Sequence, residues 1–318
     1  MTVTVKPKIQ YRVDSVSNLL ATTRRIVRDT HVQVFNARIR ASRLNGLVNI
    51  KRIDADATDF EYTPKLKRKI VMGETNPASC RSTPTPVNRA SGEPMWGKAE
   101  RHETSFELCI TDCNASNVED KIREGIEDAS DVLIGHLWSK FWLGNPARLQ
   151  FGLLNHELIQ VVESPPNGTG GSSKWRDKTN SQIAAEIRTY VKYMSRPRIM
   201  LAETTYVEAL ATGDSDVGDR GCKLRSNCIK QLLVDQTDLP ITADFSFEMM
   251  EDLNNVSMYA GSNVAMIYDA DAIVLTSSGP IIIDAFAQSA KMVEQIMEIN
   301  TGALEIEYTD SVFLLTGV

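Results

Sequence analysis

The 318-residue sequence lacks several features that would place it in a narrow class. No apolar stretch approaches the roughly 18 residues of a membrane-spanning helix. The opening residues, MTVTVKPKIQYR, contain no apolar segment typical of a secretory signal. Cysteines are few and odd in number, with no C-x-x-C pair, so we expect reduced thiols rather than a disulfide framework. They are Cys80, Cys109, Cys113, Cys222 and Cys228, and we interpret Cys109 and Cys113 as small buried hydrophobic residues.

The sequence also lacks a recognisable catalytic or metal-binding motif. Of its four histidines, none lies three or four residues from another histidine or a cysteine, as a local metal site would require. His136 falls in a helical pattern, and we interpret it as a structural neighbour of an apolar stripe. No G-x-S-x-G segment is present. We therefore predict no catalytic, cofactor-binding or metal site, and a protein that is not an enzyme.

One glycine-rich segment, residues 167–174 (NGTGGSSK), leaves an enzymatic alternative open. A phosphate-binding loop needs G-x-x-x-x-G-K-[ST] between a buried strand and a helix. Here no Lys-Ser or Lys-Thr pair follows the glycines. We favour a surface loop, and a phosphate- or nucleotide-binding enzyme remains a remote alternative.

Charge is unevenly distributed along the chain. Residues 1–70 hold 15 Lys and Arg against 6 Asp and Glu, whereas the remainder holds 20 against 35, so the formal net charge is −6. Such asymmetry suggests that the basic end meets something acidic. Nucleic acid and the acidic part of a neighbouring copy are both candidates, and a solvated basic face is the simpler alternative.

The clearest predicted element is a long helix over residues 117–142. Ser116 and Glu119 fit a capping box, and Gly144 supplies a stop signal. At 1.5 Å per residue this helix is about 39 Å long, which suggests a structural axis. Its apolar stripe consists of Val118, Ile122, Ile126, Ala129, Leu133, Leu137 and Phe141.

The other elements alternate between helix and strand. We predict a short amphipathic helix within residues 13–26, and 292–299 fits either a helix or a strand. Asn300-Thr301-Gly302 is predicted to be a turn between two extended runs. Further strands are predicted at 47–71, 104–111, 198–202, 241–247, 264–275, 304–308 and 312–315, and helices from 180, at 203–212 and at 222–236. Residues 155–288 thus read as one α/β or α+β domain.

Residues 72–103 form a long segment without periodicity. It is rich in proline and glycine, and it has one pair of large apolar residues, Met95 and Trp96. Such a segment in a compact protein is usually functional or disordered. The backbone N–H and C=O groups of an extended segment need hydrogen-bond partners. We therefore infer that neighbouring identical subunits receive this segment and the polar arm at residues 1–30.

The order of these parts resembles the major capsid proteins of tailed bacteriophages, whose Hong Kong 97-like fold is shared by encapsulin shells. The helix at 117–142 is similar to the family's spine helix, and Phe151–His156 (FGLLNH) to its GLLN segment, although Glu157 stands where proline is common. Residues 161–179 are similar to the loop that leads into the axial domain. Thr301–Ile306 and Thr316–Val318 look like the family's last hairpin.

The resemblance implies an α+β fold in five parts. These are an N-terminal arm (1–45), a peripheral domain (46–61 and 104–154) containing the spine helix, an extended loop (62–103), an axial domain (155–288) and peripheral C-terminal strands (289–318). In that fold residues 292–299 are a strand. The implied contacts between subunits are made by charged residues of the extended loop together with an aromatic anchor. They are Lys65, Lys67, Arg68, Lys69, Arg81, Arg89, Met95 and Trp96.

The implied function is self-assembly, as pentamers and hexamers, into an icosahedral phage head that encloses double-stranded DNA. The protein is then a virion component assembled in the host bacterial cytoplasm, without a membrane. Because the chain starts at Met1 without room for a scaffolding segment, we expect a separate scaffolding protein or none. Portal and decoration proteins are further candidate partners. An encapsulin-like nanocompartment shell is the alternative, which its cargo would distinguish.

Overall fold

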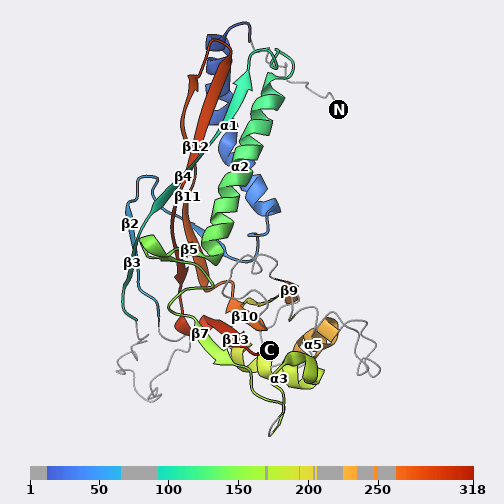
Figure 1. Cartoon of the computed structure of the whole chain (residues 1–318). Coiled ribbons are helices and arrows are strands. Elements are labelled where there is room, and N and C mark those ends of the chain that lie inside the picture. The colour runs from blue at the N-terminus through green and yellow to red at the C-terminus, as the bar shows by residue number, and fades with distance from the viewer. Residues whose placement is uncertain are drawn as a thin grey trace, which may run out of the picture.

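The computed structural model describes residues 13–65, 92–168, 171–192, 194–202, 205, 225–234, 247–249 and 263–318. The molecule is elongated (Figure 1). Two long helices lie beside long strands at one end, and a sheet of shorter strands with two short helices forms the other end. This mixture of elements confirms the predicted α+β class. None of the helices in the described ranges is long and apolar enough to cross a membrane.

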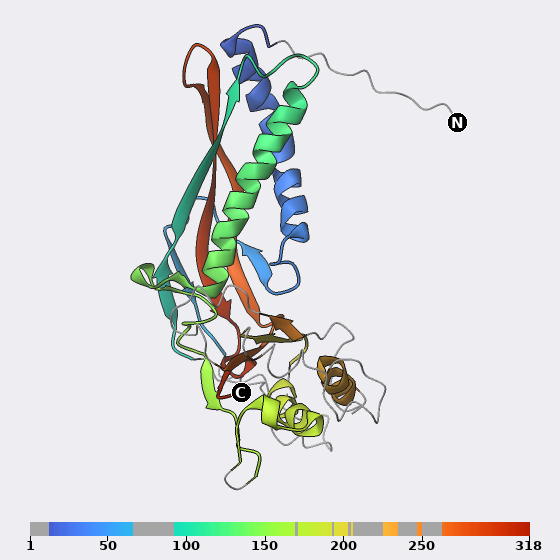
Figure 2. The same ribbon diagram turned by 45° about the vertical axis from the view of Figure 1, so that its right-hand side comes forward.

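The elongated end is built on a four-stranded sheet in the order β1-β11-β12-β4. Its strands are β1 (Asn49–Arg52), β4 (Glu100–Cys109), β11 (Ile273–Ala287) and β12 (Met292–Ile306). β11, β12 and β4 pair antiparallel, and β1 adds in parallel to β11. Helices α1 and α2 lie along the same side of this sheet in both ribbon views (Figures 1 and 2).

Helix α2 (Val118–Trp142) confirms the predicted spine helix. The residues of its predicted stripe are all buried, at 0–2% exposure, in the main hydrophobic core. The predicted capping box is wrong: the N-cap is Asn117, which makes no side-chain cap bond. Instead, the Asn114 side chain accepts hydrogen bonds from the backbone N–H groups of Ser116 and Asn117. An Asx turn therefore replaces the cap that the sequence spacing suggested.

Helix α1 (Val16–Ala41) is much longer than the short helix predicted within residues 13–26. Ser15 caps its N-terminus, and Leu19, Ile26 and Phe35 are among its residues buried in the main core. Much of the predicted N-terminal arm (1–45) is thus packed against its own chain rather than extended. The prediction fell short because polar and charged residues interrupt the apolar stripe, so the pattern is weak beyond Ile26.

Strand β12 resolves the ambiguous region near the C-terminus. Residues 292–299 are a strand, and the predicted turn at Asn300–Gly302 is wrong because β12 continues through it to Ile306. Asn300 and Thr301 are fully buried. Gly302 lies against β11, where an added Cβ would come 2.3 Å from Thr276 Oγ1. These turn-forming residue types here allow close packing within a long strand.

The other end contains a five-stranded sheet in the order β7-β13-β10-β8-β9. Its strands are β7 (Gln160–Glu163), β8 (Pro197–Leu201), β9 (Phe247–Met249), β10 (Val264–Asp269) and β13 (Val312–Thr316). Helices α3 (Asn180–Val191) and α5 (Arg225–Val234) accompany it. A second core cluster, centred on Trp175, Ile187 and Ile267, lies between the sheet and these helices.

The two sheets divide the chain differently from the predicted domains. β11 lies within the range predicted as axial (155–288) but pairs in the four-stranded sheet, and β13, predicted as peripheral, pairs in the five-stranded sheet. The sequence pattern identified both strands but not their partners, because pairing depends on contacts distant in sequence. Ala270–Ala272 form the crossing between the two sheets.

A two-stranded ribbon, β2 (Asp59–Tyr62) with β3 (Met95–Lys98), projects beside the sheet on the side opposite the helices (Figures 1 and 2). It brackets the predicted extended loop, of which residues 66–91 lie outside the described residues. β4 begins at Glu100, four residues before the predicted strand. Of the predicted helix at 203–212 and strand at 241–247, only Thr205 and Phe247 are described. Cys113 is buried as predicted, whereas Cys109 is half-buried.

Candidate assembly surfaces and the networks that position them

Three of the eight predicted contact residues lie in the described part of the chain. Trp96 is 61% exposed on β3, whereas Met95 is half-buried beside it. Lys65 is half-buried at the start of the extended loop. The other five, Lys67, Arg68, Lys69, Arg81 and Arg89, lie outside the described residues. The ribbon therefore presents Trp96 outward and turns its neighbour towards its own chain.

The inner face of the ribbon is anchored by a chain of polar contacts. The backbone N–H of Leu158 donates to His156 Nδ1 at 3.1 Å, so the other ring nitrogen, Nε2, carries the proton and faces the Tyr62 hydroxyl at 2.6 Å. Tyr62 in turn donates to the sulfur of Met95 at 3.0 Å. Burial of His156 lowers its pKa to about 4, so the ring is neutral near pH 7.

Lys65 fixes the other end of the ribbon. Its backbone exchanges hydrogen bonds with Glu307 and Thr309, and its ammonium pairs with the Glu307 carboxylate and lies over the Tyr308 ring, 5.1 Å from the centroid. The predicted contact residue thus already has partners within its own chain. We interpret it as the residue that anchors the start of the extended loop.

The GLLNH segment completes the C-terminal end of the spine helix. The last carbonyls of a helix have no partner inside it. Here the N–H groups of Leu153 and Leu154 donate to the carbonyls of Phe141 and Trp142, at 2.7 and 3.0 Å. The Asn155 side chain donates to the Leu143 carbonyl and accepts from Gly152 N–H, both at 2.8 Å. The segment therefore caps the helix through its backbone and through the Asn155 side chain.

Gly152 is required by this close approach. A Cβ there would lie 2.3 Å from Leu143 N and 2.4 Å from the Trp142 carbonyl carbon. Gly144 has a φ of +62°, and an added Cβ would lie 2.3 Å from the Gln150 carbonyl oxygen. Both glycines are therefore dictated by backbone packing at the end of α2.

A buried ion pair joins the end of α2 to β4. The Lys140 ammonium contacts the Glu100 carboxylate and donates to Gln150 Oε1 at 3.0 Å. Asn145 also donates to Glu100, at 3.1 Å. Burial opposes the charged form of Glu100, but the hydrogen bonds from Lys140 and Asn145 outweigh it and hold the pKa of this carboxyl below its usual value.

His136 lies on the spine helix beside the apolar stripe, as predicted, and it stacks on His102 of β4 with ring centroids 4.4 Å apart. Burial, together with the neighbouring His136 and Lys140, lowers the pKa of His102 to about 4. Two stacked imidazoles cannot both be charged without repulsion. His102 is therefore neutral near pH 7, and its ring forms a stacked contact between the sheet and the helix.

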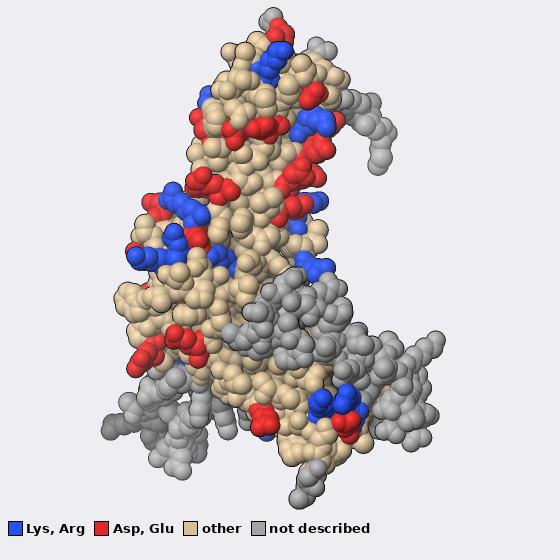
Figure 3. Space-filling view, viewed as in Figure 1, with Lys and Arg blue, Asp and Glu red and all other residues tan. Residues whose placement is uncertain are grey.

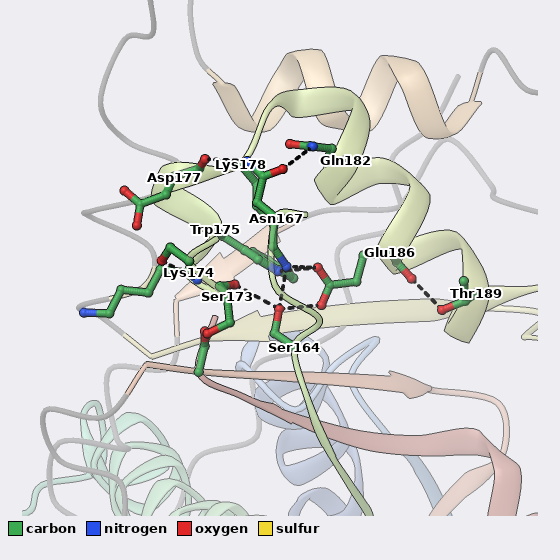
Figure 4. A network of polar contacts seen from close by, with 12 residues as sticks. Ser164, Asn167, Ser173, Lys174, Trp175, Asp177, Lys178, Gln182, Glu186 and Thr189 are labelled. Carbon is green, nitrogen blue, oxygen red and sulfur yellow. Dashed lines mark hydrogen bonds and ion pairs between the residues drawn. The ribbon is translucent and has the colours of Figure 1, made fainter. Parts of the chain in front are cut away.

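A second buried ion pair holds the glycine-rich loop to α3 (Figure 4). Lys178 Nζ contacts Glu186 Oε2 and Ser164 Oγ, both at 2.7 Å, and the two charged side chains are 3% and 4% exposed. Trp175 donates its indole N–H to the same carboxylate at 3.1 Å. Ser164 donates to the other carboxylate oxygen at 2.8 Å. Both sides of the predicted surface loop are therefore held to α3 by a buried network of hydrogen bonds and an ion pair.

This arrangement does not form a phosphate cradle within the described residues of the loop. Lys178 is committed to Glu186, and the Lys174 side chain points away from the network (Figure 4). The N-terminal donors of α3 are served by a capping box between Thr179 and Gln182. Lys178 and the N-terminus of α3 are therefore already engaged within the chain, so they do not provide phosphate-binding groups for a nucleotide.

The outward face of α2 forms an acidic edge (Figure 3). The acidic side chains recur at helical spacing, so they lie along one face. The members of this acidic edge are Asp120, Glu124, Glu127, Asp128 and Asp131. Asp131 pairs with Arg38 of α1. Adjacent like charges are unfavourable in an isolated helix, so this face suits a basic partner.

A search for metal-binding groups finds no cluster of three or more His, Cys, Asp or Glu among the described residues. Sequence reasoning missed the Lys140–Glu100 and Lys178–Glu186 pairs. Their partners are 40 and 8 residues apart, and nothing in the sequence marks a lysine as buried. Trp96 could be singled out from the sequence because it stands in a segment with almost no other large apolar residue.

Comparison with solved structures defines the class of fold. The capsid of a Myoviridae phage, XM1, matches with a TM-score of 0.53 and 12% identity, covering 87% of this chain and 91% of that one. The capsid of a native GTA particle matches with a TM-score of 0.50 and 11% identity, covering 86% and 89%. The capsid of an empty GTA particle gives 0.51 and 10%, covering 86% and 88%. The chain therefore has a Hong Kong 97-like capsid fold.

The sequence comparison points to the same class. Residues 126–212 match the family model of the major capsid protein. No curated protein matches the chain. The family match includes the second half of the spine helix, the GLLNH segment and the network around Lys178. The resemblance to the major capsid proteins of tailed phages is thus confirmed.

Proposed function

We propose that this chain is the major capsid protein of a tailed bacteriophage, which self-assembles into the icosahedral shell of the head. The observation that supports this most directly is the capsid fold over most of the chain, together with the family match at residues 126–212. Family and fold point to a structural rather than an enzymatic role. The same comparisons give no preference to an encapsulin shell or a nucleotide-binding enzyme.

The parts of the fold take the roles of the family's domains. The four-stranded sheet with α1 and α2 is the peripheral domain, and the five-stranded sheet with α3 and α5 is the axial domain, whose copies meet around pentamer and hexamer axes. The β2–β3 ribbon is the base of the extended loop. This assignment follows the strand pairing, so it places β11 in the peripheral domain and β13 in the axial domain.

Charge gives the extended loop an orientation on its neighbour. Its basic residues are Lys65, Lys67, Arg68, Lys69, Arg81 and Arg89. The Lys65 ammonium is already paired with Glu307 of its own chain, so the acidic edge of α2 in the adjacent subunit is the proposed partner of the other five. Exposed ion pairs contribute only about 0–1 kcal/mol each, so they orient the loop, whereas Trp96 supplies the apolar anchor.

Double-stranded DNA is the proposed content of the shell, held without sequence specificity, and the mature protein is a component of the virion assembled in the bacterial cytoplasm. Scaffolding, portal and decoration proteins are further proposed partners. The test is to purify particles from expressing cells, treat them with nuclease and measure their protected contents. A shell from an infected host should protect DNA, whereas a cargo enzyme without DNA would support the encapsulin alternative.

A further inference from the structure

The largest exposed apolar side chain among the described residues is Trp96, at 61% exposure. It lies on the outward face of the β2–β3 ribbon. Glu61 is its direct cross-strand partner, and Lys98 stands two residues further along the same face. Trp96 thus projects with one anion and one cation beside it. An exposed tryptophan on a narrow ribbon is a typical interface anchor.

A hollow of about 370 Å³ lies on the helical side of the molecule, between the end of α1 and the second half of α2. Leu44 and Ile134 are buried in its floor and Trp138 is half-buried there. Arg43 and Asp131, both exposed, stand at its rim. The hollow therefore combines an apolar floor with one cation and one anion, the complement of the surroundings of Trp96.

Gly135 gives a second, independent indication that this hollow is occupied. It lies inside α2, where glycine is less favourable than alanine. Apart from its chain neighbours and the surrounding helix backbone, no atom of the described residues lies within 4 Å of the position that a Cβ would take. The fold therefore does not require a glycine here, although a close partner would. Val132, one turn earlier, is 50% exposed and extends the apolar surface.

The hollow and Trp96 cannot meet within one chain, because the ribbon and the helices lie on opposite sides of the four-stranded sheet (Figures 1 and 2). A second copy placed beside the first brings them together. Such a head-to-tail contact uses two different surfaces, and it forms a ring when the rotation between copies closes. The acidic edge of α2 borders the same hollow through Asp131.

We propose that Trp96 of one subunit inserts into the hollow formed by Leu44, Ile134, Gly135 and Trp138 of its neighbour. Glu61 then lies near Arg43 and Lys98 near Asp131 of that neighbour. Asp131 already pairs with Arg38, so these charges orient the contact, while the tryptophan supplies most of its affinity. This inference rests on the proposed shell function and assigns its contact surface.

The test measures the critical concentration for assembly by light scattering, with the full chain. Trp96→Ala should raise it at least tenfold, and Trp96→Phe by less. Gly135→Phe fills the hollow and should also raise it at least tenfold, whereas Gly135→Ala adds one methyl group at the contact and should raise it by less. Trp96 and Gly135 are both exposed, so we expect every variant to fold, as checked by circular dichroism.

The double variant Trp96→Ala/Gly135→Phe distinguishes a shared contact from two separate ones. If the tryptophan fills this hollow, the double variant should assemble no worse than the poorer single variant. The proposal is overturned if either single variant assembles like the parent, or if the two effects multiply. A parent chain that never assembles would instead overturn the proposed function, so the two failures are distinguishable.

Discussion

At the scale of single residues, the buried Lys178–Glu186 pair is the most sensitive point of the axial domain. Glu186→Gln leaves the Lys178 ammonium in a site where both side chains are under 5% exposed. Removing one partner of a buried pair typically costs about 3–5 kcal/mol. We expect a loss of this size in urea unfolding. Lys174→Met, in the same loop with its side chain directed away, should change the free energy of unfolding by about 0.5 kcal/mol or less.

His156 makes stability depend on pH. Its folded pKa of about 4 lies below the ordinary value of 6.5, so in mild acid the unfolded chain binds a proton that the folded chain does not. The contribution of His156 to the free energy of unfolding is fully present above pH 6.5 and is lost as the pH falls towards 4. Protonation at Nδ1 would also oppose the Leu158 N–H that now donates there.

We therefore expect urea unfolding at pH 7, 5.5 and 4.5 to show a steeper loss of stability in the parent than in His156→Gln. Comparing the two chains removes the contribution of the carboxylates, which titrate in both. Parallel pH profiles for parent and variant would contradict the burial of a neutral His156 at the base of the ribbon.

At the scale of elements, the end of the spine helix depends on Gly152. Gly152→Ala places a methyl group 2.3 Å from Leu143 N, against backbone that cannot move freely. We expect a loss of more than about 2 kcal/mol, through backbone strain and displaced capping bonds. Gly135→Ala, in the same helix but beside open space, should instead stabilise the isolated subunit by up to about 1 kcal/mol.

Chemical denaturation of the two variants, with circular dichroism at 222 nm as the readout, gives the comparison. Equal effects would show that Gly152 is not needed for the close approach of the GLLNH segment to the end of α2. Loss of stability in Gly135→Ala would show that the hollow beside it is already filled by its own chain.

The elements differ in how far the sequence determines them. The spine helix was predicted within one residue at its N-terminal end, because seven apolar residues share one stripe and Gly144 follows. α1 was underestimated because its stripe is interrupted by polar residues, and its burial depends on α2 and β11. The sequence predicted a turn at Asn300–Gly302, whereas β12 runs through these residues without a break. Their burial against neighbouring strands overrides the turn preference of the residue types.

At the scale of the whole molecule, the sequence sufficed for the class of fold but not for the sites. The order of arm, loop, spine helix and insert carried the resemblance, and Trp96 stood out by its isolation. The exchange of β11 and β13 between the two sheets, the two buried ion pairs and the hollow on α2 depend on contacts between distant segments. A local sequence pattern does not indicate which distant segments are in contact.

The account treats the single chain as an incomplete unit. Its projecting ribbon and its hollow face outward in one subunit, and we propose that they meet between subunits. Each contact can be modest, since a closed shell multiplies many of them. Interfaces of this kind should weaken in high salt, where exposed charges are screened.

The most direct test is electron microscopy of the purified full-length chain, with light scattering on the same sample. The account predicts closed particles of uniform diameter with icosahedral symmetry, in which the β2–β3 ribbon of each subunit lies against the α2 face of the next. A chain that remains a monomer at every salt and protein concentration tested would contradict it.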